Sequence, residues 1–206
     1  MKLTCSRPAL AAALRTCAGV ADKQATMPAL AMVRLTAKGS TLRCSATDLN
    51  VAVSVDVPTK GDGGDVLVPA AEFAKAVDSL PGLEVTLALE GSGHLAARAG
   101  KARQVVPLSI PARDAPKLPV ADGQWQSAES VPLAEVLRAC IPAICADDTR
   151  FRLCGINLVS AHGVLRGDST DGHRLHTFRR SWDAEVPIGI VPRASMGPST
   201  NVDGDP

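Results

Sequence analysis

The first apolar pattern along the chain has the period of a helix. Leu10, Leu14 and Cys17 recur at intervals of three to four residues within residues 7–20, which places them on one helical stripe. Ser6 precedes this stretch as a candidate N-cap, and Pro8 falls in the first turn, where a proline is tolerated. The pattern therefore predicts an amphipathic helix over residues 7–20, entered from a short N-terminal strand.

Alternating apolar and polar positions follow this helix. The clearest case is residues 51–57, where valines alternate with Ala52, Ser54 and Asp56, as expected of a half-buried strand. Phe73, Val77 and Leu80 then return to a helical spacing between Pro69 and Pro81. The predicted strands are residues 31–37, 41–46, 51–57, 66–68, 83–89, 95–99 and 103–108, with a second helix over 69–80 and a turn-rich stretch at 60–65. The predicted order is β-α-β-β-β-β-α-β-β-β.

The second part of the chain repeats the first at an offset of about 123 residues. Thr47-Asp48 recurs as Thr170-Asp171, Val68-Pro69 recurs as Val191-Pro192, and Ser130-Val131-Pro132 opens a second helical run at 133–141. Repeated pairs in one order predict a duplicated domain. The predicted strands of this copy are 151–159, 164–168, 174–180 and 186–191, with Ala161-His162-Gly163 as a hairpin turn. We expect one domain at 1–119, a second and incomplete one at 120–195, an extended proline-rich linker at 111–124, and a disordered tail at 196–206.

Composition narrows the classes of function. Aromatic residues make up 2% of the chain and tyrosine is absent, which disfavours a base-stacking surface. Residues 1–120 carry 14 Lys/Arg against 10 Asp/Glu and residues 121–206 carry 8 against 11, so contact with DNA is expected to be loose or topological. The six cysteines match no disulfide or zinc framework and are expected to be buried thiols in a reducing cytoplasm. No stretch approaches eighteen apolar residues, so we expect neither secretion nor membrane spanning.

Six segments together resemble one protein family. They are Thr26–Leu30, Thr47-Asp48-Leu49, Val68-Pro69-Ala70, Arg98-Ala99-Gly100, residues 111–116 and, most specifically, Thr170-Asp171-Gly172-His173-Arg174-Leu175. Over about residues 1–195 the chain resembles the bacterial replicative sliding clamp, the β subunit of DNA polymerase III. The resemblance implies an α+β DNA clamp fold of repeated domains, each with two helices packed on antiparallel sheets.

The same resemblance implies a function. Members of the family form a head-to-tail dimeric ring of three domains per chain, which retains DNA by topology and confers processivity without catalysis or a cofactor. The implied partners are duplex DNA, the polymerase III α subunit, the clamp loader and other proteins with clamp-binding motifs. Here the second copy stops early and a third domain is absent, so we expect a truncated clamp polypeptide that cannot close the standard dimeric ring.

Two groups of residues are expected to contact DNA. Arg7, Arg15 and Lys75 lie on the two predicted helices and are candidates for a weakly positive inner face, with a solvated helix face as the alternative. By resemblance, a second group matches positions where clamps touch duplex or template strand: Lys23, Gln24, Arg150, Phe151 and Arg152. Arg150 and Arg152 are expected on one face at the start of a strand, where a solvated sheet edge is the alternative.

The resemblance also implies a peptide groove and a subunit interface. The groove residues that match are Leu153, Thr170, Gly172, His173, Arg174 and Leu175. Because the rest of the groove wall comes from absent segments, we expect a half-groove of weak affinity. The edge strand that would pair with a partner subunit carries Arg103, Gln104, Val105, Pro107 and Leu108, and Pro107 removes one ladder donor.

Two other functions are compatible with parts of the sequence. A metal-dependent hydrolase would use Asp168, Asp171, His173 and His176 as ligands. Against it, a strand-like pattern would send His173 and His176 to opposite faces. A peptide-binding module of the replication machinery that does not encircle DNA is the other alternative, and it predicts no retention on circular DNA.

Overall fold

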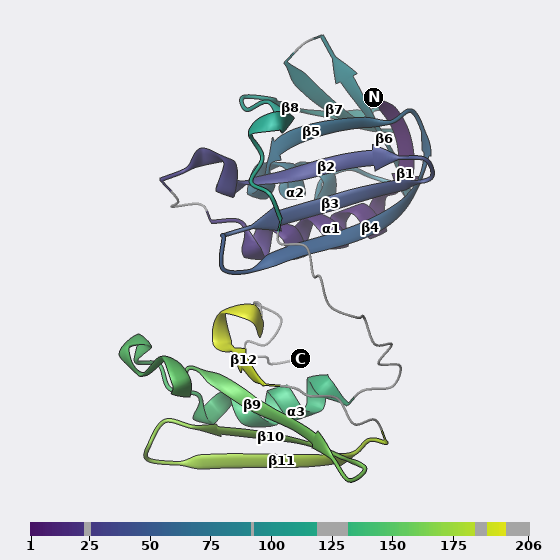
Figure 1. Ribbon diagram of the computed structural model, residues 1–206. Coiled ribbons are helices and arrows are strands. Elements are labelled where there is room, and N and C mark those ends of the chain that lie inside the picture. The colour runs from purple at the N-terminus through teal and green to yellow at the C-terminus, as the bar shows by residue number, and fades with distance from the viewer. Residues whose placement is uncertain (23–25, 92, 119–131, 184–188, 197–206) are drawn as a thin grey trace. The chain divides into compact units, whose positions relative to one another are not determined.

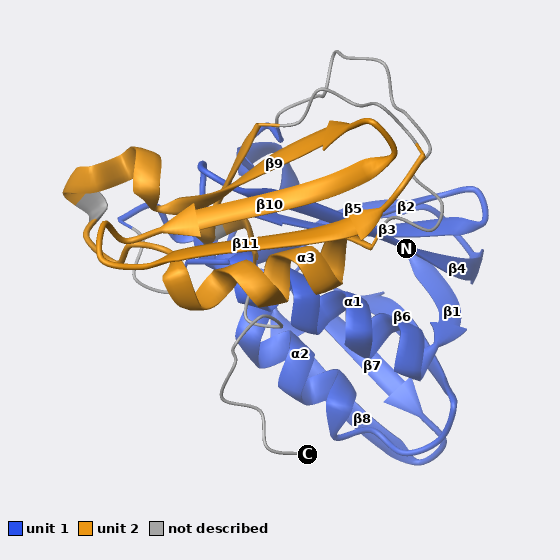
Figure 2. Ribbon diagram, turned by 90° about the horizontal axis from the view of Figure 1, so that it is seen from below, with its two compact units in different colours: residues 1–121 blue, residues 122–206 orange. Residues whose placement is uncertain are grey.

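The computed structural model divides the chain into two compact units, residues 1–121 and 122–206 (Figures 1 and 2). The structure describes residues 1–22, 26–91, 93–118, 132–183 and 189–196. Residues 119–131, which include the start of the predicted second domain, and the tail from residue 197 lie outside these described residues. Among the helices that the structure describes, none has the length and apolarity needed to cross a membrane.

Unit 1 has the predicted order of elements. They are β1 (Lys2–Ser6), α1 (Arg7–Val20), β2 (Met32–Lys38), β3 (Thr41–Thr47), β4 (Ala52–Gly61), β5 (Gly64–Pro69), α2 (Ala70–Asp78), β6 (Glu84–Glu90), β7 (His94–Ala99) and β8 (Ala102–Pro107). The strands form one antiparallel sheet in the order β5-β2-β3-β4-β1-β6-β7-β8. Both helices pack side by side against the same sheet (Figure 1). The predicted turn-rich stretch is shorter than expected, because β4 runs to Gly61 and β5 begins at Gly64.

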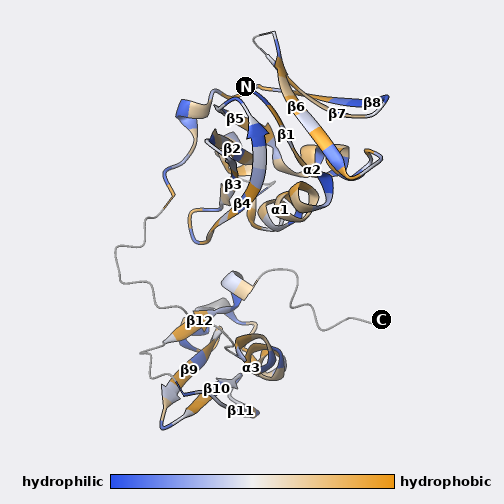
Figure 3. Ribbon diagram, turned by 90° about the vertical axis from the view of Figure 1, so that its right-hand side faces the viewer, coloured by the Kyte–Doolittle hydropathy of each residue, from blue (hydrophilic) through white to orange (hydrophobic). Residues whose placement is uncertain are grey.

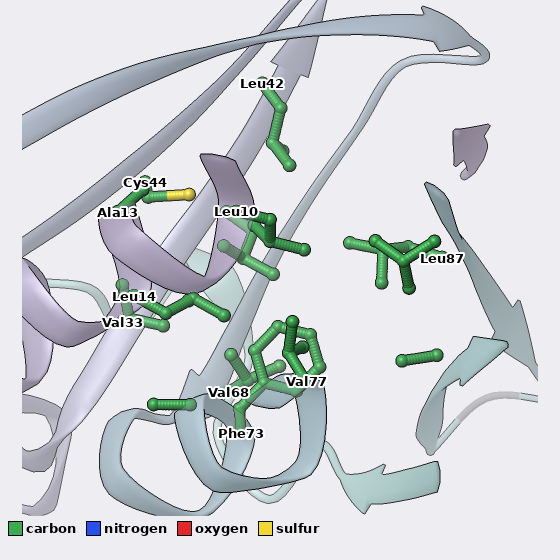
Figure 4. Packing of buried hydrophobic residues seen from close by; sticks show 14 of the residues in the cluster. Leu10, Ala13, Leu14, Val33, Leu42, Cys44, Val68, Phe73, Val77 and Leu87 are labelled. Atoms are coloured by element: carbon green, nitrogen blue, oxygen red, sulfur yellow. The ribbon is translucent and has the colours of Figure 1, made fainter. Parts of the chain in front are cut away.

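The core of unit 1 lies between the helices and the sheet. Ser6 caps α1 by accepting a hydrogen bond from the Ala9 N–H, as the sequence predicts. Leu10 and Leu14 of α1 meet Phe73 and Val77 of α2 in one apolar cluster, to which the strands add residues such as Leu42 and Leu87 (Figure 4).

Three thiols belong to this core. Burial raises the pKa of Cys5 to about 11 and that of Cys17 to about 12, and it also raises the pKa of Cys44. All three are therefore protonated at neutral pH and pack as small apolar groups.

Unit 2 is a smaller version of the same arrangement. It contains α3 (Leu133–Cys140), β9 (Gly155–Ala161), β10 (Val164–Thr170), β11 (Leu175–Ser181) and β12 (Ile190–Pro192), with sheet order β11-β10-β9-β12. Its core joins Val136 and Cys140 of α3 to Ile156, Leu158 and Leu165 of the sheet. Apolar residues recur along the strands and helices of both units in Figure 3. Gly167 lies under α3, so close that an added Cβ would fall 2.5 Å from Val136 Cγ1.

The strand registers of the two units match at the predicted offset. Arg34 pairs with Ser45 in unit 1 and Asn157 pairs with Asp168 in unit 2, each 123 positions further on. Two other strand pairs repeat in the same way: Leu42 with Val57 as Leu165 with Arg180, and Val33 with Val68 as Ile156 with Val191. The repeat seen in the sequence is therefore a repeat of hydrogen-bonded structure.

Two local predictions were wrong. Residues 151–153 do not begin a strand: they end a 3-10 segment, Asp148–Leu153, and β9 starts at Gly155. The cause is Asp147, whose carboxylate accepts hydrogen bonds from both the N–H and the hydroxyl of Thr149 and so turns the chain. The segment 111–118, predicted as an extended linker, forms a 3-10 turn at Ala112–Asp114 and then packs on unit 1.

Candidate functional site

The hexapeptide Thr170–Leu175 forms a tight turn between β10 and β11. The Thr170 hydroxyl donates to the Arg174 carbonyl at 2.7 Å and accepts from the Gly172 N–H at 3.1 Å. Asp171 Oδ1 accepts from the N–H groups of His173 and Arg174, and its Oδ2 accepts from Arg174 Nε at 2.9 Å. Gly172 has φ +91°, a conformation that side chains disfavour. The turn is fixed almost wholly by its own residues.

These hydrogen bonds have an electrostatic consequence. The backbone N–H of His173, followed by that of Arg174, stabilises the charged carboxylate and lowers the pKa of Asp171 from 3.8 to about 2. Asp171 is thus ionised throughout the neutral range. Its charged carboxylate accepts the hydrogen bonds that hold the turn.

Unit 1 contains the same turn 123 residues earlier. The Thr47 hydroxyl donates to the Val51 carbonyl and accepts from the Leu49 N–H, while Asp48 Oδ1 accepts from the N–H groups of Asn50 and Val51. Leu49 stands at the position of Gly172 and also has a positive φ, +76°. The Thr-Asp pairs therefore recur because each builds the same turn.

A depression of about 180 Å³ lies beside the turn in unit 2. The structure brings together three of the predicted groove residues in its lining, Leu153, Thr170 and Leu175. Leu175 is 65% exposed at the start of β11 and adds apolar surface to the depression. Gly172, His173 and Arg174 shape the adjacent turn and are not among the lining residues.

Sequence reasoning missed part of this lining. The remaining lining residues are Arg152, Gly155, Asn157, Asp168 and Ser169. Strand alternation places Asn157 and Asp168 on the same sheet face as Thr170, because that face is the one opposite the buried Ile156 and Leu165. The period of two in β9 and β10 was the signal that would have found them.

The 3-10 segment 148–153 carries Arg150, Phe151 and Arg152, which belong to the second group of expected DNA contacts. Phe151 is 73% exposed, and the Arg152 guanidinium lies 5.7 Å from the centre of its ring. Arg150 instead points toward the groove turn, where its Nη1 donates to the Asp171 carbonyl at 3.2 Å. The prediction that Arg150 and Arg152 share one strand face was wrong, because this segment is a 3-10 turn and not a strand.

Unit 1 carries the helical candidates. Arg15 Nη1 forms an ion pair with Asp78 at 2.7 Å, which ties α1 to the end of α2. Arg7 Nε donates to the Gly82 carbonyl at 2.6 Å, and Lys75 is exposed on α2. Lys23 and Gln24 fall outside the described residues. Arg7, Arg15 and Lys75 thus lie on two adjacent helices, with part of the charge of Arg15 balanced by Asp78.

β8 is an edge strand, as the interface prediction requires. Arg103 pairs with Glu90, Gln104 Nε2 donates to the Ser79 hydroxyl at 3.2 Å, and Val105 is 38% exposed. Pro107 is the last residue of the strand and lies opposite His94. Leu108 differs from the others because it packs against the core of unit 1.

The metal-site hypothesis is not supported by the geometry. His176 Nδ1 is within 3.0 Å of the Ala139 carbonyl on the α3 side of the sheet, whereas Asp168 pairs with Arg166 at 3.0 Å on the opposite face. Asp171 is held by its own turn, together with the His173 backbone. Within the residues that the structure describes, no cluster of three or more His, Cys, Asp or Glu side chains is placed to hold a metal ion. The hydrolase hypothesis was wrong.

Comparison with known proteins gives a consistent result. The family model described as "DNA polymerase III beta subunit, N-terminal domain" matches residues 1–119. A beta sliding clamp of Caulobacter vibrioides is 35% identical over 214 residues, covering 95% of this chain and 55% of the relative. One of Pseudomonas aeruginosa is 31% identical over 205 residues, with the same coverage of both chains. The chain spans about half the length of the curated relatives it matches.

Solved structures agree with the sequence relatives. A crystal structure of the Caulobacter crescentus beta sliding clamp superposes with a TM-score of 0.81 at 31% identity, covering 94% of this chain and 54% of that one. The DNA polymerase III subunit beta from Pseudomonas aeruginosa gives a TM-score of 0.77 at 31% identity, with the same coverage. The similarity extends across both units of the chain.

Proposed function

Because the chain belongs to the DNA polymerase III beta subunit family, we propose that it is a non-catalytic DNA sliding clamp polypeptide that holds the replicative polymerase on duplex DNA. The observation that carries the proposal is the duplicated clamp-fold unit, with matching strand registers and the same Thr-Asp turn in each copy. A ring built from such repeats retains DNA by enclosing it, so it needs no sequence-specific contacts.

The charge on the unit 1 helices supports this kind of DNA contact. α1 and α2 carry Arg7, Arg15 and Lys75 against Glu72 and Asp78, a small positive excess. A weakly basic face attracts phosphates without holding one register, which lets a duplex slide. We assign DNA contact to these three cations and to Lys23, Gln24, Arg150, Phe151 and Arg152.

Retention on circular DNA tests the proposal. The full chain, loaded by a clamp loader on nicked circular DNA, is expected to stay bound through gel filtration and to be released when the circle is linearised. Light scattering on the chain without DNA reports how many 21.3 kDa chains assemble. A chain that leaves circular and linear DNA equally fast would refute encirclement.

A charge variant tests the assigned face. Lys75→Gln is expected to reduce the salt dependence of DNA binding by about one phosphate contact, that is, a change of roughly 0.9 in the slope of log K against log salt. Lys38→Gln is the matched control, since Lys38 is exposed at the end of β2 and, next to the core residue Ala37, alternates to the sheet face opposite the helices. Equal slopes for the two variants would contradict the assignment of DNA contact to α2.

The depression in unit 2 supports a second activity, the capture of clamp-binding peptides. Its partners would be the polymerase III α subunit, the clamp loader and other proteins with such motifs, held by Leu153, Thr170 and Leu175 and by the turn Gly172-His173-Arg174. β8, with Arg103, Gln104, Val105, Pro107 and Leu108, is the proposed subunit interface. A peptide-binding module that does not encircle DNA is the alternative, favoured by the fact that this depression is formed within unit 2 alone. It predicts peptide binding without retention on circular DNA.

A further inference from the structure

The two units contain equivalent depressions at one hairpin end of the sheet, that of β2 and β3 in unit 1 and that of β9 and β10 in unit 2. In unit 1 the depression is about 290 Å³, lies on the sheet face away from the helices, and is lined by Thr36, Lys38, Thr41, Arg43 and Asp56. These five positions reappear 123 residues later in the lining of a depression of about 240 Å³ in unit 2. Unit 1 is described through α2 and β8 and its depression is still open, so the later elements of the repeat leave this position uncovered.

Unit 1 supplies its own ion pair at this position. Arg43 and Asp56 lie opposite each other on β3 and β4. Nε and Nη2 of Arg43 donate to the two carboxylate oxygens of Asp56, each at 2.8 Å. This two-point geometry is the one in which a guanidinium matches a carboxylate best. The arginine of unit 1 is therefore already paired with a carboxylate of the same chain.

Unit 2 keeps the arginine but not the carboxylate. Arg166 stands at the position of Arg43, and the residue opposite it on β11 is Arg179. Like charges directly opposite each other destabilise a strand pair. Arg166 Nε donates to Asp168 Oδ2 on its own strand at 3.0 Å, whereas Arg179 forms no ion pair with any residue that the structure describes. The two guanidinium groups of unit 2 thus share one carboxylate, and it contacts Arg166 through Nε.

The walls of the unit 2 depression are apolar. The positions that hold Thr, Lys and Thr in unit 1 hold Val159, Ala161 and Val164 in unit 2. All three are only partly buried, so their apolar surface is accessible in the described structure. Ligand sites typically combine such apolar walls with a few charged groups that fix orientation. A carboxylate with an aliphatic group beside it fits this lining better than a phosphate, which offers no apolar surface.

We propose that this depression of unit 2, which we call the arginine site, binds an acidic segment of a partner protein. Its residues are Val159, Ala161, His162, Val164, Arg166 and Arg179. A Glu carboxylate of the partner takes the role that Asp56 has in unit 1 and bridges the two guanidinium groups, while a neighbouring aliphatic side chain of the partner contacts the two valines. The inference goes beyond the proposed function, because the arginine site has no lining residue in common with the depression beside the Thr170–Leu175 turn.

The probe is a fluorescently labelled peptide, Gly-Ser-Leu-Glu-Leu-Glu-Gly-Ser, titrated with the full chain and followed by anisotropy. The same peptide with Gln in place of each Glu is the control, since it keeps the shape and loses the charge. The amide peptide is expected to bind on the order of tenfold more weakly than the acidic one, because hydrogen bonds between charged groups are stronger than neutral ones. No binding of the acidic peptide, or equal binding of the two, would overturn the inference and leave the proposed function untouched.

Three variants locate the binding. Arg179→Ala is expected to weaken it on the order of fivefold, the effect of losing an exposed ion pair. Arg179→Asp recreates the unit 1 pair with Arg166, so it should weaken binding further and yet leave the chain at least as stable in urea, because opposite charges across a strand pair are stabilising. Arg43→Ala, which removes the same charge from the equivalent position of unit 1, should leave the affinity unchanged. A similar loss for Arg43→Ala and Arg179→Ala would show a general effect of net charge and refute the arginine site.

Two competitors separate this inference from the proposed function. A polymerase-derived clamp-binding peptide should not displace the acidic peptide; displacement would place the acidic peptide in the other depression and overturn the inference. A short DNA duplex that displaces the acidic peptide would identify a phosphate site and would also overturn it. If the polymerase peptide does not bind, while acidic-peptide binding is lost in Arg179→Asp, the inference stands and peptide capture is removed from the proposed function.

Discussion

The close approach of α3 to its sheet gives a testable prediction, because it depends on the absence of a Cβ atom at Gly167. Gly167→Ala adds a Cβ that would lie 2.5 Å from Val136 Cγ1 and 3.1 Å from Cys140 Sγ. Carbon atoms in contact are normally about 3.5–4.0 Å apart. Valine has one strongly preferred side-chain rotamer in a helix, so Val136 cannot turn away cheaply and α3 must move outward by about 1 Å.

Overpacking of this kind typically costs about 1–3 kcal/mol in the free energy of unfolding. The chain has two tryptophans, Trp125 and Trp182, and no tyrosine, so in a Trp125→Phe background the fluorescence comes from Trp182 alone. Trp182 packs against the unit 2 core and is a direct probe of it. In urea, the fluorescence midpoint of the Gly167→Ala chain is expected to fall by roughly 1 M.

Gly189→Ala is the matched control, since nothing lies within 4 Å of its added Cβ, and its effect should stay within about 0.5 kcal/mol. In a Val136→Ala background the clashing methyl is gone, so Gly167→Ala should cost less there by at least about 0.5 kcal/mol. Equal midpoints for Gly167→Ala and Gly189→Ala would show that α3 does not lie where we describe it.

Three further predictions use the same fluorescence or circular dichroism. The pKa of Asp171 is lowered to about 2 in the folded chain, so its contribution to stability is fully present above its ordinary pKa of 3.8 and is lost as the pH falls toward 2. Between pH 4 and pH 2, the urea midpoint of the native chain should therefore drop more steeply than that of Asp171→Asn. Gly172→Ala should keep unit 2 folded but cost about 1–3 kcal/mol, because φ +91° strains an alanine; an unchanged midpoint would contradict this. Phe73→Ala should destabilise unit 1 by about 3–5 kcal/mol, lowering the circular dichroism melt while the tryptophan transition stays in place.

Most of unit 1 could be predicted because its signals are local. The valine alternation in β4, the Ser6 cap and the spacing of Phe73 and Val77 each act within a few residues, and all three elements form as expected. The offset of 123 residues predicted the domain repeat without any knowledge of strand pairing, and the observed registers follow it.

Predictions failed where the backbone conformation is set by a side-chain hydrogen bond or by packing against a surface that is distant in sequence. Asp147 turns residues 148–153 through its carboxylate, which overrides the strand-like pattern of Phe151-Arg152-Leu153. The segment 115–118 looks like a linker because of its prolines, and only the outer face of the unit 1 sheet gives its apolar side chains a place to pack. In the candidate groove, the family resemblance predicted Leu153, Thr170 and Leu175, whereas Asn157 and Asp168 could have been found from the period of two in β9 and β10.

The repeated register also bears on how the two copies of this fold can exchange sequence. Because strand pairing is the same at a constant offset, a stretch of sheet copied from one unit into the other by recombination would keep its hydrogen bonds. The packing of α3 would not tolerate this exchange. Cys44 of unit 1 occupies the position that Gly167 has in unit 2, directly beneath Val136 and Cys140 of α3. The spacing between helix and sheet therefore differs between the two copies. A chimera that keeps this spacing must transfer the helix together with the strand that it covers.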